Sequence, residues 1–249
     1  MGDKSAIEWT NATWNVITGC DKVSPGCKNC YAERYALRLK KMGTKKYSHG
    51  FKLTFHPDAM EYPLTLKQPR MIFVNSMSDL FHKDIPFTFI EKVFDIMKQA
   101  NWHQYQILTK RSERLREFGE YFGRFPENVW IGVSAESAPY KKRIDDLLKV
   151  DAKIHFLSLE PLLGSLGKLD LCDIEWVIAG GESGPNFREC KPEWVREIRD
   201  QCIAEEVPFF FKQWGGTTSK SRGRTLDGRL WSEFPELQSL GIKQAPLQR

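Results

Sequence analysis

Short apolar runs alternate with helix-like segments along most of this chain, and this alternation is its clearest structural signal. Runs rich in β-branched and aromatic residues predict strands at 14–18, 71–74, 105–108, 129–133, 154–157, 176–179 and 209–211. Apolar residues at helical spacing predict helices over 31–42, 87–100, 111–122, 137–149 and 192–206. Strands that alternate with helices are typical of a parallel sheet covered by helices, so the predicted fold class is α/β.

Every predicted strand ends in polar residues, and this feature favours a barrel over an open sheet. In an open sheet only the strands beside the switch point need functional ends, whereas in a barrel all strand ends meet at one mouth. Residues able to bind or react at these ends include Lys110, Glu136, Glu160, Glu182 and Lys212. For any single loop, turn formation or helix capping remains the alternative. Together these residues predict a full or partial (β/α) barrel with a shared pocket.

Two segments depart from the repeating pattern. Residues 43–70 form a long connection that contains three prolines, which predicts an insertion or a cap over the barrel mouth. After a barrel segment over 1–215, residues 216–249 form a C-terminal basic extension. Within this extension, Asp227-Gly228 between two short strand-like segments predicts a β-hairpin with a two-residue turn.

Length and composition narrow the class of protein. The chain has 249 residues and a net charge of +5, and its 8 Trp, 16 Phe and 7 Tyr exclude a disordered chain. No apolar run approaches the roughly 18 residues of a membrane span, and the N-terminus lacks the apolar stretch of a signal peptide. We therefore expect a compact cytoplasmic protein without a membrane partner.

Three of the six cysteines, Cys20, Cys27 and Cys30, are clustered with the spacing Cys-x6-Cys-x2-Cys. In a chain without a secretion signal, such a cluster indicates metal binding or redox chemistry before it indicates disulfides. Thiolates suit zinc, copper(I) or an iron–sulfur cluster, and a structural zinc ion would need a fourth ligand such as a histidine. Three cysteines on a four-iron cluster would instead leave one iron open to a substrate or cofactor.

Motifs spread over the whole chain give a more specific indication. The segment IEWTNATWNVITGC-x6-CKNCYAER is followed by NSMSDLFH, ILTKR, IGVSAES, SLEPLLG, IAGGESG and FKQWG. From Ile7 to Gly215 the chain thereby resembles a three-cysteine radical S-adenosylmethionine (SAM)-like family that is associated with phages and bacteria and is distantly similar to spore photoproduct lyase. Its cysteine loop is three residues longer than the Cys-x3-Cys-x2-Cys loop commonest among radical SAM enzymes.

The resemblance implies a partial (β/α)6-type TIM barrel with radical SAM architecture, a [4Fe-4S] cluster on Cys20, Cys27 and Cys30, and SAM bound to the open iron. An electron donor such as flavodoxin or ferredoxin would reduce the cluster, and SAM would be cleaved to a 5′-deoxyadenosyl radical that abstracts hydrogen from a substrate. Residues expected around SAM are Tyr31, Asn75, Ser76, Ser78, Asp79, Lys110, Ser134, Glu136, Gly180, Gly181 and Glu182. Residues expected to contact substrate or act in catalysis are Glu160, Lys212, Trp214 and Cys190. Caps, turns and ion pairs remain the structural alternatives for these residues.

Positive charge is concentrated in two segments. Residues 34–57 carry seven Lys or Arg and no acidic residue, with aromatic residues between them, and residues 220–229 add four basic residues against one acidic residue. Basic and aromatic side chains together suit phosphate contact and base stacking, and the residues expected to contact nucleic acid are Arg38, Lys41, Lys45, Lys46, Arg222 and Arg224. A solvated helix face is the structural alternative for this pattern.

The leading hypothesis is therefore a radical SAM enzyme that modifies or repairs a nucleic-acid base or nucleotide, for example in phage DNA hypermodification. Two alternatives remain open. One is a radical SAM enzyme that acts on a peptide or a small metabolite. The other is a zinc-stabilised nucleic-acid-binding module without catalytic activity.

Overall fold

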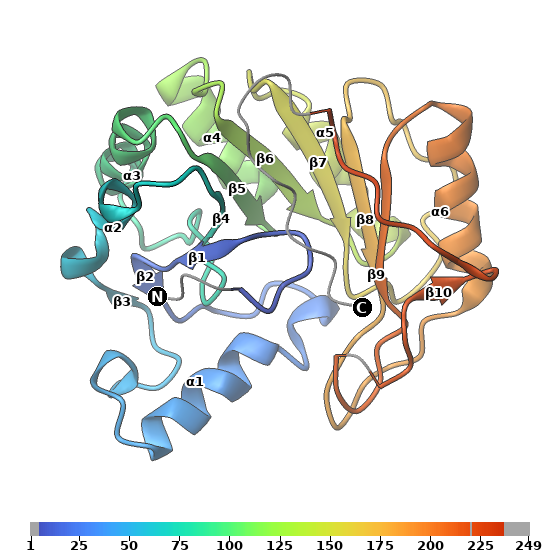
Figure 1. Ribbon diagram of the computed structural model, residues 1–249, viewed down its shortest axis with the longest axis horizontal. Helices are drawn as coiled ribbons and strands as arrows, with labels where there is room; N and C mark the ends of the chain where they lie inside the picture. The colour runs from blue at the N-terminus through green and yellow to red at the C-terminus, as the bar shows by residue number, and fades with distance from the viewer. Residues whose placement is uncertain (1–4, 220, 237–249) are drawn as a thin grey trace.

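The computed structural model describes residues 5–219 and 221–236, which form an α/β fold around one curled parallel sheet (Figure 1). The seven strands of the sheet are all parallel and follow one another in chain order, so that they form half of a barrel. They are β1 (Ala12–Trp14), β4 (Met71–Val74), β5 (Gln104–Thr109), β6 (Val129–Ser134), β7 (Ile154–Leu159), β8 (Trp176–Gly180) and β9 (Phe209–Gln213). The α/β class and the partial barrel are confirmed, with one strand more than the implied six.

The predicted helices are present with bounds close to those expected: α1 (Tyr31–Lys41), α3 (Phe87–Gln99), α4 (Ser112–Phe122), α5 (Lys142–Leu147) and α6 (Pro192–Ala204). Helix α5 is shorter than predicted because a 3-10 turn, Ala138–Tyr140, takes up the start of that segment. Helices α3 to α6 cover the outer side of the sheet, whereas α1 lies below the strands in Figure 1. No helix in the described part of the chain combines the length and apolar character needed to cross a membrane.

The first strand predicted from the sequence, 14–18, is wrong in its placement. The sheet strand β1 ends at Trp14, and the next apolar residues form a separate strand, β2 (Ile17–Thr18), which pairs antiparallel with β3 (Thr54–Phe55). Asn15 explains the break, because its buried side-chain oxygen accepts a hydrogen bond from Met77 N (3.0 Å). This contact ties the chain to the loop that follows β4 and turns it out of the sheet.

Residues 43–70 form an irregular insertion that contains β3, α2 (Tyr62–Thr65) and two 3-10 turns, Lys45–Tyr47 and Pro57–Ala59. The insertion is attached to the chain just before the first cysteine, since His56 N donates to Val16 O (2.8 Å) and Thr18 Oγ1 bonds His56 Nε2 (2.8 Å). Phe51 alone of this segment lines the cavity at the mouth of the half-barrel. The insertion therefore supports the cysteine loop more than it caps the mouth.

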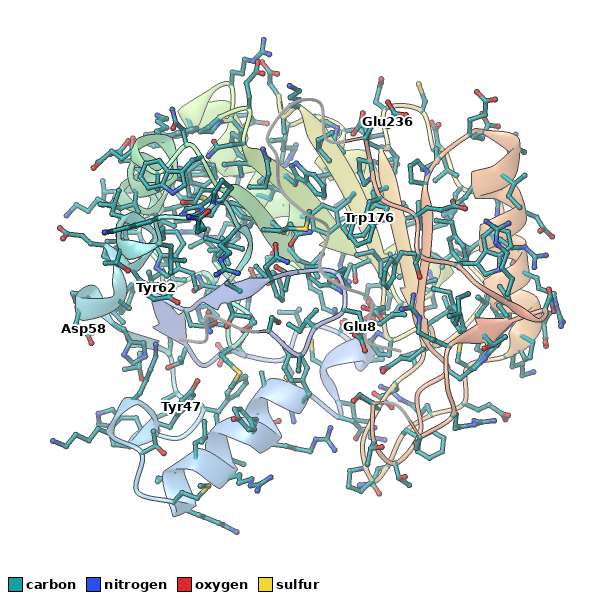
Figure 2. The ribbon with its side chains drawn as sticks, in the orientation of Figure 1. Glu8, Tyr47, Asp58, Tyr62, Trp176 and Glu236 are labelled. Atoms are coloured by element: carbon teal, nitrogen blue, oxygen red, sulfur yellow. The ribbon has the colours of Figure 1, made fainter. Side chains whose placement is uncertain are left out.

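Successive side chains along each strand point to opposite faces of the sheet, and this alternation creates two cores. Side chains that face the helices are mostly Ile, Val and Leu. Side chains on the concave side form an aromatic layer of Trp9, Phe73, Trp130, Phe156, Trp176 and Phe210. Figure 2 shows Trp176 among the strands, with Glu8 lower in the same view. Because the aromatic layer fills the interior of the half-barrel, the carboxyl ends of the strands are left for a site.

The predicted hairpin is confirmed as β10 (Thr225–Leu226) paired with β11 (Arg229–Leu230). Asp227 and Gly228 have φ values of 50° and 76°, the left-handed values that a type I′ turn requires. Phe211 N donates to Trp231 O (3.0 Å), so the chain after the hairpin lies along the last strand of the sheet. The described part of the extension thus belongs to the main core, and residues 237–249 lie outside the described residues.

Candidate functional site

A cavity of about 680 Å³ opens at the carboxyl ends of the parallel strands. Its walls come from the cysteine loop, helix α1, the strand ends and the N-terminal segment 6–9. A cavity of this size is typical of sites that hold small molecules and cofactors. The predicted residues that line it are Cys20, Cys27, Cys30, Tyr31, Arg38, Asn75, Ser76, Ser78, Asp79, Lys110, Ser134, Glu160, Gly181, Glu182 and Lys212.

The cysteine loop, residues 20–30, connects strand β2 to helix α1. It starts after Gly19, which has a φ of +87° and whose Cβ, if present, would lie 2.2 Å from Lys52 O, so that only glycine fits there. Cys27 ends a 3-10 turn, Pro25–Cys27, and Cys30 directly precedes the first residue of α1. All three thiols are free and half-buried at the cavity wall.

The surroundings of these thiols favour their protonated form in the absence of a metal. Burial and the charge of Asp79 raise the pKa of Cys20 to about 11, although Arg111 Nη2 lies 3.8 Å from its sulfur. Burial also raises the pKa of Cys30. Such thiols are poor nucleophiles by themselves, but a metal centre deprotonates the thiols that coordinate it. The environment therefore fits metal ligands better than a free catalytic thiol.

The spacing of the sulfurs bears on the kind of metal. Over residues 5–219 and 221–236, the one set of three His, Cys, Asp or Glu ligand atoms within 4.8 Å of one another is that of Asp21, His82 and Asp84. The three thiol sulfurs are thus not all within 4.8 Å of one another, and in those ranges no set of four ligand atoms is that close together. Among the described residues the thiols therefore do not form a closed four-ligand site of the kind that holds a structural zinc ion.

Glu136 does not line the cavity, contrary to the expected contact with SAM. Its fully buried carboxylate accepts hydrogen bonds from Gly26 N (3.1 Å) and Arg143 Nη1 (2.8 Å). Burial raises the pKa of Glu136, but a hydrogen bond from Ser24 and the charges of Arg143 and Lys110 outweigh it, so the pKa lies below its usual value. The ionised carboxylate fixes the cysteine loop instead of binding a cofactor.

A second carboxylate, Glu182, fastens the other side of the cysteine loop. Its Oε2 accepts hydrogen bonds from Asn29 Nδ2 (2.9 Å) and Arg188 N (2.9 Å), and Arg188 Nη2 also donates to Pro25 O (2.9 Å). Burial raises the pKa of Glu182, but the hydrogen bonds from Arg188 and Asn29 outweigh this effect and lower it. We call Asn29, Glu182 and Arg188 the loop clamp. Glu182 lines the cavity, as predicted, but its two carboxylate oxygens already accept hydrogen bonds from Asn29 and Arg188.

Asp79 has internal partners as well. Its carboxylate accepts hydrogen bonds from Thr109 Oγ1 (2.7 Å), Phe81 N (3.0 Å) and Lys110 N (3.2 Å). Asp79 therefore joins the loop after β4 to the end of β5. Asp79 also lines the cavity, as expected, and among the described residues its Oδ2 accepts only the Lys110 bond, so contact with the amino group of SAM stays a prediction.

Several polar atoms at the cavity wall lack a partner. Trp9 Nε1, Asn75 Nδ2, Glu160 Oε1 and Gln213 Oε1 are buried without a hydrogen bond to the described part of the chain, and all four residues line the cavity. Buried polar atoms of this kind are rare because each loses its hydration without compensation. Their concentration around one cavity is typical of a binding site.

Glu160 and Lys212 form an ion pair in the wall, with Lys212 Nζ 3.1 Å from Glu160 Oε2. Lys110 Nζ donates to the backbone oxygen of Glu160 (3.3 Å). Gly180 makes room for this pair, because a Cβ there would lie 2.3 Å from Glu160 Oε1. Gly180 itself does not line the cavity, unlike its neighbour Gly181, and its observed role is to make room for the Glu160–Lys212 pair.

Two residues expected in catalysis lie away from the cavity wall. Trp214 Nε1 donates to Thr225 O (2.9 Å), and the indole ring packs against Phe211 with centroids 4.6 Å apart. Cys190 is 3% exposed, and burial together with the charge of Glu160 raises its pKa to about 12. Trp214 therefore holds the hairpin to β9, and Cys190 is a core residue.

A family model described as a protein of unknown function (DUF5131) matches residues 4–235, which include the cysteine loop, the half-barrel and the hairpin. The chain belongs to this family. No curated protein and no solved structure matches the chain. Membership of DUF5131 supplies no activity, so the function is argued from the site.

The basic residues of this DUF5131 chain that were expected to contact nucleic acid fall into two groups. Arg38 lines the cavity, and the other exposed ones are Lys41, Lys45 and Arg222. Lys46 instead donates to Asn15 O (2.8 Å), and burial lowers its pKa. Arg224 donates to Phe211 O (3.2 Å) and Ser232 Oγ (2.7 Å). Lys46 and Arg224 therefore stabilise the fold, whereas Arg38, Lys41, Lys45 and Arg222 are exposed.

Sequence reasoning missed Trp9 and the partners of the buried carboxylates. Trp9 lies in the N-terminal motif IEW, whose two apolar residues are the local signal for its burial. Asn29, Arg143 and Arg188 gave no such signal, because their partners are recognised only in the folded chain. Arg188 and Pro25, for example, are 163 residues apart in the sequence.

Proposed function

We propose that this chain is a radical SAM enzyme that acts on a nucleic-acid base or nucleotide. The observation that carries the proposal is the position of Cys20, Cys27 and Cys30, three free and half-buried thiols on the wall of a cavity at the mouth of a parallel half-barrel. The carboxyl ends of parallel barrel strands are where enzymes of this architecture place their active sites.

The donor set fits a [4Fe-4S] cluster bound through three of its irons. Thiolate is the ligand that iron–sulfur clusters take, and within the described ranges no four His, Cys, Asp or Glu ligand atoms lie close enough together to hold a single ion. Cys20, Cys27 and Cys30 would hold the cluster. When bound, a cluster with an open iron supplies the electron for reductive cleavage of SAM and thereby a means of hydrogen abstraction.

The residues of this chain would bind SAM and exclude water from the site. Asn75 offers a buried amide donor, and Ser76 and Ser78 lie in the same wall. Lys110 also lines the cavity, where its ammonium group can pair with a carboxylate. The aromatic layer fills the interior of the half-barrel beneath the site and would exclude water on that side.

Side chains at the cavity wall support a nucleic-acid substrate. Tyr31, Arg34, Tyr35 and Arg38 all lie on α1, and all four line the cavity. Arginine contacts phosphate groups, and tyrosine rings stack on bases. A base in a duplex would have to be unpaired or flipped out to enter such a cavity.

Hydrogen transfer tests this proposal. After anaerobic reconstitution with iron and sulfide, the reduced protein incubated with SAM and a deuterated oligonucleotide is expected to place deuterium in 5′-deoxyadenosine. Cys27→Ala is expected to abolish this transfer. Cys172→Ala, which removes an exposed cysteine outside the cavity wall, is expected to leave it unchanged.

Two outcomes would contradict the proposal in different ways. If SAM is cleaved but no nucleic acid transfers label, the substrate class is wrong. If the anaerobically purified protein holds one tightly bound zinc and takes up no iron, the chemistry is wrong.

A further inference from the structure

The exposed side of α1 carries a continuous row of side chains that leads away from the cavity. Tyr31, Tyr35, Arg38 and Met42 follow one another at spacings of four, three and four residues, which places them along one side of the helix and its C-terminal end. Tyr31 and Tyr35 are each 50% exposed and Met42 is 67% exposed. We call these four residues the α1 stripe.

The stripe is continuous with the candidate site. Tyr31, Tyr35 and Arg38 line the cavity, and Met42 lies at the outer end of the stripe. The other side of the helix packs on the protein through the buried residues Ala32 and Ala36. In Figure 1, α1 lies at the mouth of the half-barrel, apart from the helices that cover its outer side.

The charge of α1 indicates which kind of ligand would bind to the stripe. The helix carries four basic residues, Arg34, Arg38, Lys40 and Lys41, against one acidic residue, Glu33. At helical spacing, Arg34 and Lys41 fall on one flank of the stripe. Exposed aromatic rings beside a row of positive charges are the combination that binds single-stranded nucleic acid, in which bases stack on the rings and phosphates contact the cations.

We propose that the α1 stripe holds a single-stranded polynucleotide beside the cavity, so that the substrate is a base within a strand and not a free nucleotide. This inference rests on the proposed function and adds the form of the substrate. An 11-residue helix spans roughly 16 Å, which is long enough to contact a few stacked nucleotides. A free nucleotide in the cavity would have no use for the outer end of the stripe at Met42.

Binding to the full-length protein tests the inference, with a short fluorescein-labelled single-stranded oligonucleotide as the probe. Fluorescence anisotropy is expected to show binding that weakens steeply with salt and that mononucleotides compete poorly. Tyr35→Ala is expected to reduce the affinity about 10-fold or more through loss of a stacking surface. Arg38→Gln is expected to weaken binding and to reduce the salt dependence by about one phosphate contact.

Two matched variants serve as controls. Tyr121→Ala removes a tyrosine from α4 that is 54% exposed, and Arg124→Gln removes an exposed arginine just beyond that helix. Neither residue lines the cavity, so both variants are expected to bind the strand as the wild type does. Circular dichroism of all four variants checks that the fold is retained.

The inference is overturned if a mononucleotide binds as well as the strand, or if Tyr35→Ala has no effect. It is also overturned if the stripe joins two copies of the chain, seen as a dimer that Tyr35→Ala dissociates, or if an acidic flavodoxin displaces the strand from it. SAM cleavage is measured on the same preparations. Weak strand binding with intact SAM cleavage counts against the α1 stripe alone, whereas tight strand binding without iron counts against the proposed chemistry alone.

Discussion

Two glycines on the concave side of the sheet show how single residues shape this site. A Cβ on Gly132 would lie 2.6 Å from the ring of Phe156, and a Cβ on Gly180 would lie 2.3 Å from Glu160 Oε1. The aromatic layer and the Glu160–Lys212 pair therefore each depend on a missing methyl group. The sequence predicts the two strands that contain these glycines. It does not predict which side chain lies over each glycine, because that depends on the register between neighbouring strands.

Gly132→Ala tests this packing. The added methyl group is expected to displace the Phe156 ring and to lower the free energy of unfolding by about 1–3 kcal/mol, measured by urea denaturation. Gly164→Ala is a suitable control, because the nearest atom to its new Cβ would be Ser137 Cβ at 3.4 Å. Unchanged stability of Gly132→Ala would contradict the packing of Phe156 against β6.

The buried carboxylate of Glu136 predicts a dependence of stability on acid pH. Its pKa is lower in the folded chain than its usual value of 4.5. Its contribution to the free energy of unfolding is therefore present above the unfolded-state pKa and is lost as the pH falls through the folded-state pKa. Glu136→Gln is expected to be less stable at about pH 7 and to lose less stability than the wild type on acidification to about pH 3. Parallel urea titrations of the two proteins measure this difference, and an equal loss in both would contradict the assigned role.

At the scale of elements, the sequence predicts what depends on local periodicity. Helices α3, α4 and α6 begin and end within two residues of the expected bounds because each carries its own apolar face. The first strand could not be predicted correctly, since residues 14–18 read as one apolar run although Ile17 and Thr18 pair with β3. The cysteine loop could be located at the mouth because it follows a strand. Its attachment to Glu136 and Glu182 could not, because those contacts join distant segments.

Arg188→Ala tests whether the loop clamp holds this element in place. The variant keeps the backbone N–H but loses the bonds from the Arg188 guanidinium to both oxygens of Glu182 and to Pro25 O, which leaves a buried carboxylate without its cation. The cysteine loop is therefore expected to open more often. Maleimide labelling of the loop thiols in the metal-free protein is expected to become about 10-fold faster, in keeping with the loss of charge-assisted hydrogen bonds.

Arg196→Ala is the matched control for this measurement. It removes an exposed ion pair with Asp227, 2.7 Å long, on the hairpin side of the molecule. Labelling of the loop thiols is expected to remain at the wild-type rate in this variant. If Arg188→Ala and Arg196→Ala label alike, the clamp does not restrain the cysteine loop.

At the scale of the whole molecule, the half-barrel brings polar strand ends between Asn75 and Gln213 to one cavity. The partial barrel could be predicted because every strand ends in polar residues, which an open sheet does not require. The way in which α1 and the loops complete the cavity wall could not be predicted, since it depends on contacts between segments that are distant in the sequence. Arg34 Nη2, for example, donates to Ser183 O (2.9 Å) and joins α1 to the loop after β8.

The electron paramagnetic resonance spectrum of the reconstituted and reduced protein, recorded with and without SAM, tests the central claim most directly. The account predicts about four iron and four sulfide per chain, a reduced-cluster signal that Cys30→Ala removes, and a change in that signal when SAM binds to the open iron. A cluster signal that SAM leaves unchanged, or a protein that retains zinc and takes up no iron, would contradict the account.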